Sequence, residues 1–308
     1  MSQEPRIRDL YCPGTHTDRA FVPVPQDTKR IFRLIASQTP GFHESIISKV
    51  RFTGDKFPVI SGPIKALSVA AALNAMAGVV ADEILTLRGV EDKERKVTVN
   101  TTHAGLWFGN IATAYVDGKD VLTLAKSREL EKLWPDWERG WVDTPLKFRT
   151  TGLYHTSDPD VWYSLHGSMN AEPGLKSICV DPSDAITSNE EAAVHIAKST
   201  SKISPEKLEF TILVNGNCGN ICFTPKQWNE SEMGKSLAAH PLINVKVQPQ
   251  AIPKPPVAFP PLDPADKRPL DGIKVVEMAR VIAGPQIGTI LSSFGADIIR
   301  VNPPHLPD

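Results

Sequence analysis

The clearest hydrophobic pattern in the chain lies in residues 269–308. An apolar run over Ile273–Met278 is followed by a turn over Ala279–Pro285, an apolar helical segment over about Gln286–Phe294 and a second apolar run over Ile298–Val301. Short apolar runs without polar alternation are typical of parallel strands that are covered on both faces. The pattern therefore predicts a strand–helix–strand unit at the start of an α/β domain.

A long helix is predicted in the first third of the chain. It begins at Gly62-Pro63, because proline fits a first turn, and it ends near Arg88-Gly89. Within it, Ala66–Ala81 carries no charge, but the run is short for a membrane span and is predicted to be a buried helix. A strand is expected at Lys96–Thr101. Further helices are expected at Arg30–Ser37, His103–Ala114 and Leu122–Trp134, and a loop at Val22–Pro25.

A smaller α+β region follows the helical part. Leu153-Tyr154 and Val161–Leu165 flank a Thr-Ser-Asp-Pro-Asp turn and predict a hairpin. Glu190–Ser199 has the pattern of an amphipathic helix, and Thr224-Pro225 has the residue types of a helix N-cap and first turn. Short strands are expected at Ile221–Phe223 and Leu242–Val247.

Prolines divide the chain near its end. Eight of them fall within residues 249–269, a density that neither a sheet nor a helix interior accepts, so a semi-rigid connector is predicted. The expected organisation is an N-terminal region of mixed character (1–60), a helical part (61–147), a small α+β domain (148–248), a proline-rich linker (249–268) and the start of a further domain (269–308).

Composition adds few constraints. The 308 residues carry a net charge of −1, which gives no basic surface for nucleic acid, and 41% of them are hydrophobic, as in an ordinary globular protein. The first residues lack the apolar core of a secretory signal, and four cysteines do not make a secreted framework, so a cytoplasmic location is predicted.

Cys218 and Cys222 could form half of a metal site or be two reduced thiols at a turn. No second pair and no histidine lies at zinc spacing, so no metal is predicted.

The motif over residues 269–304 resembles the opening of the class III CoA-transferases, the CaiB/BaiF family. This chain reads PLDGIKVVEMARVIAGPQIGTILSSFGADIIRVNPP, and the family opens approximately with LDGIRVLDLTRVLAGP and continues with LADLGADVIKVEPP. Shorter similarities cover Gly62–Thr101, Phe148–Gly167 and Cys218–Asn244. An opening motif that follows a small domain resembles the first half and the beginning of the second half of a double-length member. The resemblance implies an α/β fold whose Rossmann-like CoA-binding domain is incomplete, and hence a fragment.

The resemblance also implies a reaction. Family members transfer CoA between an acyl-CoA and a carboxylic acid through a mixed anhydride with an enzyme aspartate, which divides one difficult step into easier ones. That aspartate lies at the start of the long helix, where this chain has Ile64–Ala70 and no acidic residue. Ser68 is the nearest nucleophile, but no activating base is identifiable beside it. We therefore assign no catalytic residue.

CoA contact is the better supported expectation. In the family, the backbone of the turn that matches Arg280, Val281, Ile282 and Ala283 contacts the CoA nucleotide, and the free N–H groups of the helix that follows suit an anion. The implied ligands are coenzyme A and acyl-CoA as substrates, with carboxylic acids as their partners, and no covalent cofactor. The family forms interlocked dimers, so a homodimer of the full-length protein is expected, with neither a membrane nor nucleic acid as partner.

Two other functions stay open. The missing carboxylate is compatible with a non-catalytic remnant that binds CoA thioesters or serves dimerisation, and some relatives of this fold are acyl-CoA racemases. His166, at the end of a predicted strand, could be a ligand or an acid–base group, or could hydrogen-bond to the backbone.

Overall fold

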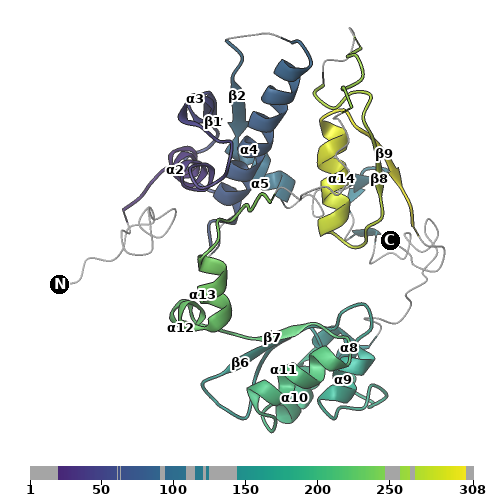
Figure 1. The fold of residues 1–308 in the computed structure, drawn as a ribbon. Coiled ribbons are helices and arrows are strands. Elements are labelled where there is room, and N and C mark those ends of the chain that lie inside the picture. Colours follow the sequence, from purple (N-terminus) through teal and green to yellow (C-terminus); the bar gives the residue numbers. More distant parts are fainter. Residues whose placement is uncertain are drawn as a thin grey trace, which may run out of the picture. The chain divides into compact units, whose positions relative to one another are not determined.

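The protein contains two compact units. In the computed structural model, one unit comprises the described residues between 20 and 124 and between 240 and 302, and the other comprises 144–239. Helices mix with small sheets in both units, which confirms an α/β fold in its general form (Figure 1). The structure describes residues 20–60, 62, 64–90, 94–108, 115–120, 123–124, 144–246, 257–263 and 268–302.

The first unit begins with helices packed on a two-stranded parallel sheet. Helix α2 spans Val24–Ala36 and helix α4 spans Ala66–Leu87, while β1 (Val50–Thr53) pairs in parallel with β2 (Val97–Asn100). The parallel pairing requires a crossover, and α4 provides it. The remaining elements of this part are α3 (Glu44–Ile47), α5 (Thr101–Phe108), β3 (Tyr115–Val116) and β4 (Lys119–Asp120).

Helix α4 is buried along one side. Ala72, Met76 and Val79 form a core with Phe32 of α2, whereas Leu73 on another side of the helix is exposed. The alanines allow this close packing, because they add little volume between helix axes. By length and composition alone α4 could also cross a membrane, a property that it shares with the core helices of many folded domains.

The second unit is built on an antiparallel sheet in the order β5–β6–β7. The predicted hairpin is confirmed: β5 (Gly152–His155) pairs with β6 (Trp162–Leu165), and β7 (Gly219–Ile221) lies on the other side of β6. Tyr163 of β6 faces the core, and its buried hydroxyl has no hydrogen-bond partner among the described residues. The helices are α8 (Pro145–Arg149), α9 (Glu172–Ser177), α10 (Asn189–Thr200), α11 (Pro205–Val214), α12 (Pro225–Glu230) and α13 (Glu232–Ala238).

The predicted strand–helix–strand unit is confirmed at the end of the first unit. Strand β8 (Lys274–Glu277), helix α14 (Ala283–Ser293) and strand β9 (Asp297–Arg300) follow in that order, and β8 pairs in parallel with β9 (Figure 1). Helix α14 packs on one face of this pair. Val276 and Ile299 on the other face are more than half exposed. The apolar pattern predicts that other elements pack on both faces of this strand pair. Among the described residues, only the face against α14 is packed in this way.

Part of the proline-rich segment is attached to the end of α4. Arg88 donates hydrogen bonds from Nη1 to Pro269 O (2.8 Å) and from Nη2 to Pro260 O (2.6 Å). Its guanidinium also lies 5.6 Å from the centroid of the Phe259 ring, within cation–π range. Arg88 therefore joins α4 to the segment that leads into β8.

Some predicted elements differ from the structure. Helix α2 already begins at Val24, because Pro25 fits its first turn, so the loop expected at Val22–Pro25 is wrong in its second half. Helix α4 begins at Ala66, later than expected. Leu242–Val247 is no strand as far as it is described, and Ile243 packs instead against the core around α4. The end of the predicted helix His103–Ala114, most of Leu122–Trp134 and Cys12 lie outside the described residues.

Candidate functional site

The turn between β8 and α14 contains the residues for which the family resemblance implies contact with CoA. Arg280, Val281 and Ile282 lie in the turn, and Ala283 is the first residue of α14. Arg280 is half-buried, whereas the other three are exposed. Val281 has φ +64°, a left-handed conformation that is rare for a β-branched residue. Such backbone conformations concentrate at functional sites, and the surrounding structure must hold them in place.

The start of α14 offers backbone N–H groups. Ile282 is the N-cap residue and makes no side-chain capping hydrogen bond, and Pro285 in the first turn has no N–H to satisfy. The first intrahelical bond runs from Gln286 N to Ile282 O (2.9 Å). The N-terminus of an eleven-residue helix carries a partial positive charge, so this end suits an anionic group.

A cleft of about 520 Å³ in the same unit is lined by residues on both sides of this turn, Glu277 before it and Pro285 after it, but by none of the turn residues 279–283. Its wall also includes Arg300 on β9 and Trp107 on α5. Gly288 and Ser292 of α14 complete this side. The cleft thus brings an acidic, a basic and an aromatic residue together at the β8–α14 end of this unit.

The start of α4, where the resemblance places a nucleophilic aspartate, contains an ion pair instead. Lys65 precedes the helix, and its Nζ contacts Asp27 Oδ2 of α2. Asp27 is 2% exposed, and its Oδ1 also accepts hydrogen bonds from Arg30 Nε (3.0 Å) and Nη2 (2.8 Å). Both carboxylate oxygens therefore face cations. Ser68 is buried in the same turn of α4 and contributes to packing.

A second buried carboxylate, Asp82, lies near the other end of α4. Arg95 Nε and Lys49 Nζ both donate to it, the latter at 3.2 Å. Burial by itself would raise the pKa of Asp82, but the hydrogen bonds from Arg95 and Lys49 outweigh burial and hold the pKa below its ordinary value. This group ties α4 to the segments before β1 and β2 and is structural.

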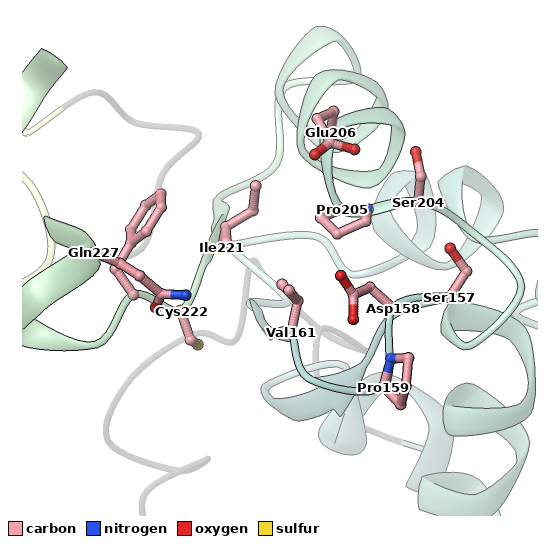
Figure 2. Close-up of a pocket in the computed structure, with 11 residues that line it drawn as sticks. Ser157, Asp158, Pro159, Val161, Ser204, Pro205, Glu206, Ile221, Cys222 and Gln227 are labelled. Carbon is pink, nitrogen blue, oxygen red and sulfur yellow. The ribbon is translucent and has the colours of Figure 1, made fainter. Parts of the chain in front are cut away.

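The second unit has a cleft of its own, of about 620 Å³ (Figure 2). Asp158 in the hairpin turn faces the start of α11 at Ser204-Pro205, and Cys222 and Gln227 form another part of the wall. Most of its polar groups maintain local structure: Asp158 Oδ1 accepts from Asp160 N (3.0 Å), and Ser204 Oγ accepts from Lys207 N (3.3 Å). The cleft is therefore a junction of a turn and a helix cap, as expected for Asp158 and Asp160.

Local geometry also describes His166 and the cysteines. Ser168 N donates to His166 Nδ1 (2.9 Å), which confirms a strand-end histidine bonded to the backbone. Cys218 and Cys222 are free thiols. Among the residues that the structure describes, no three His, Cys, Asp or Glu side chains come together to hold a metal ion.

Sequence reasoning missed three buried carboxylates, Asp27, Asp82 and Glu277. Asp27 pairs with Lys65, which lies 38 residues further along the chain, and no local sequence pattern predicts such a contact. Glu277 had a weak signal: it is the acidic residue in the run Ile273–Met278, which also contains Lys274. An acidic residue in a mainly apolar run is a candidate for a buried carboxylate, because such side chains are rarely fully buried unless they are paired.

Comparison with known proteins adds to this geometry. Residues 270–308 match CoA-transferase family III. The chain is 39% identical over 305 residues to an "Acyl-CoA transferase" of Gibberella moniliformis, a match that covers 97% of this chain and 52% of the relative. It is 28% identical over 221 residues to "Acetyl-coenzyme A transferase nodX" of Hypoxylon pulicicidum, covering 69% of this chain and 37% of the relative. A "Succinate–glutarate CoA-transferase" of Agrobacterium fabrum is 54% identical over 42 residues (14% of this chain, 10% of the relative). The chain thus spans about half the length of the Gibberella relative and a smaller part of the Hypoxylon relative. No solved structure matches it significantly.

Proposed function

The chain belongs to CoA-transferase family III, and from this membership we propose that it takes part in the transfer of CoA between an acyl-CoA and a carboxylic acid. The observation that carries the proposal is the family match over 270–308, because it falls on β8, the exposed turn and α14. CoA and acyl-CoA are substrates in this reaction, and the carboxylic acid is the acceptor. A cytoplasmic location, expected from the composition, and a homodimer, implied by the resemblance, belong to the proposal.

The turn Arg280–Ala283 is the proposed contact for the CoA nucleotide. Val281, Ile282 and Ala283 are exposed, and Val281 has a left-handed backbone conformation. The uncapped start of α14 lies next to it and favours a phosphate. A Rossmann-like arrangement of the complete domain is the proposed setting for this contact.

The attacking carboxylate is not supplied by the start of α4 in this proposal. A nucleophilic carboxylate needs an accessible oxygen that is not neutralised, whereas both oxygens of Asp27 are engaged by Lys65 and Arg30. A serine nucleophile needs a base, and Ser68 has none among its described contacts and is buried. This part of the chain therefore supports the architecture, and we infer that it lacks the family's nucleophile.

Isothermal titration of the 308-residue chain with CoA and with acetyl-CoA tests the binding. The informative variant is Ile282→Asp, which places a negative charge in the turn. Ile287→Asp is its matched control, because both isoleucines are 61% exposed and Ile287 lies one turn into α14. We expect Ile282→Asp to weaken CoA binding by about tenfold, or about 1.4 kcal/mol, and Ile287→Asp to change it little. Absence of CoA binding by the native chain contradicts the proposal.

A non-catalytic CoA-binding module is the second candidate, and the Lys65–Asp27 pair favours it. The two candidates differ in turnover. Incubation with an acyl-CoA and a carboxylic acid, followed by chromatography of both thioesters, gives a new acyl-CoA only if the chain is catalytic. Loss of that product in Ser68→Ala would show that Ser68 is the nucleophile after all.

A further inference from the structure

Glu277 stands out as a buried charged group that the proposed chemistry does not use. We propose that Glu277 is a positioning residue, whose carboxylate, held between Arg300 and the glycine face of α14, fixes the turn over residues 279–283 in the conformation that receives CoA. The inference rests on the proposed function of that turn. It concerns how the turn keeps its shape, which the family match does not address.

The burial of Glu277 is unusual for an acidic side chain. It is the last residue of β8 and is 9% exposed. Its Oε1 lies 3.6 Å from Arg300 Nε on β9, the residue opposite it in the sheet register. Its Oε2 is fully buried and has no hydrogen-bond partner among the described residues. An unsatisfied buried acceptor costs about 1–3 kcal/mol, so a position that keeps one calls for an explanation.

Two glycines of α14 fit around the end of β8. A Cβ atom at Gly288 would overlap Glu277 Oε2, and a Cβ atom at Gly284 would overlap the Cβ of Ala279. The two glycines are four residues apart and therefore lie on one face of the helix. Glycine in a helix interior costs about 0.5–1 kcal/mol relative to alanine. These glycines allow α14 to approach closely the last residue of β8, Glu277, and the first residue of the turn, Ala279.

These contacts hold both ends of a strained turn. Val281 in its middle adopts a conformation that costs about 1–3 kcal/mol and persists only where the surroundings determine it. On the strand side, Val301 N donates to Glu277 O (2.9 Å), and on the helix side Gln286 N donates to Ile282 O (2.9 Å). If the carboxylate loses its charge, the ion pair with Arg300 is lost and α14 can shift away from β8. The turn can then relax to a conformation without positive φ.

The test compares two ligands. CoA contains the nucleotide that the turn contacts, whereas 4′-phosphopantetheine lacks it. We expect Glu277→Gln, which removes the charge that pairs with Arg300, to weaken CoA binding by about tenfold, or about 1.4 kcal/mol, and to leave the affinity for 4′-phosphopantetheine unchanged. Asp297→Asn is the matched control, since Asp297 is an exposed carboxylate on β9 of the same sheet. A purely structural role would change both affinities alike.

The glycine contact provides a second, independent readout. Gly288→Ala should weaken CoA binding in the native background and have no further effect in the Glu277→Ala background, because the overlapping oxygen is then gone. This pair decides the question if Glu277→Gln does not fold, as judged by circular dichroism. If the native chain does not bind CoA, the proposed function is wrong and this inference falls with it. If the native chain binds CoA and Glu277→Gln binds both ligands as the native chain does, or Gly288→Ala acts equally in both backgrounds, the inference alone is overturned.

Discussion

The Lys65–Asp27 pair at the start of α4 leads to a quantitative prediction for Asp27→Asn. The native carboxylate is 2% exposed and accepts hydrogen bonds from Arg30 and Lys65. Breaking a buried ion pair by removing one partner costs about 3–5 kcal/mol. Here the two cations are 47% and 27% exposed and regain hydration, which lowers the cost to about 2–3 kcal/mol. Loss of a negative charge from the first turn of α2 adds about 0.3–1 kcal/mol.

The total of about 3 kcal/mol is measurable by urea unfolding followed by circular dichroism. With a slope of about 1–3 kcal/mol per molar urea, the midpoint should fall by about 1–3 M without a change in slope. Glu44→Gln is the matched control, because Glu44 forms a surface pair with Arg33 (2.8 Å) that should contribute less than about 1 kcal/mol. CoA affinity should not change in either variant.

Two results would refute this reasoning. If the urea midpoint of Asp27→Asn equals that of the native chain, the Lys65–Asp27 pair is not a buried ionic contact in solution. If the variant is as stable as the native chain but loses CoA transfer, Asp27 acts chemically, and the start of α4 is a working site after all.

Three further predictions concern Asp82, Tyr163 and Arg88. Asp82→Asn should cost about 2–4 kcal/mol at pH 7. The pKa of Asp82 is lower in the folded chain than its unfolded value of 3.8. The carboxylate therefore stabilises the fold above pH 3.8, and this contribution is lost as the pH falls below 3.8. The difference in urea midpoint between the native chain and Asp82→Asn should accordingly shrink in acid. Burial raises the pKa of Tyr163 to about 12, so the free energy of unfolding should decline between pH 10 and 12 as this tyrosine ionises in the unfolded chain. Tyr163→Phe should remove part of this decline and change the stability at neutral pH by less than about 1 kcal/mol. An alkaline stability profile that is the same in the variant would contradict this prediction. Arg88→Ala should speed hydrogen exchange at residues 268–274, because it removes the two hydrogen bonds to Pro260 and Pro269; exchange that stays as slow as in the native chain would show that the segment is held by other contacts.

Local sequence patterns were sufficient for much of the fold. The strand–helix–strand order over residues 273–301, the hairpin around Asp158 and the helix N-cap at Thr224 depend on interactions between near neighbours, and each is present in the structure. Periodicity also predicted the long helix, although its start was placed too early. Element boundaries are set by the first satisfied backbone hydrogen bonds, which residue types fix only approximately.

The tertiary structure decided the features that depend on distant contacts. The sequence located the turn Arg280–Ala283, but only the fold placed the left-handed Val281 there and brought Glu277 against Gly288 of α14. Likewise, the sequence showed that residues 64–70 contain no acid, yet it could not show that Asp27 occupies this position from another helix and is neutralised there. The physical reason is that propensity and periodicity act over a few residues, whereas the burial and pairing of a charge depend on which segments the whole chain brings together.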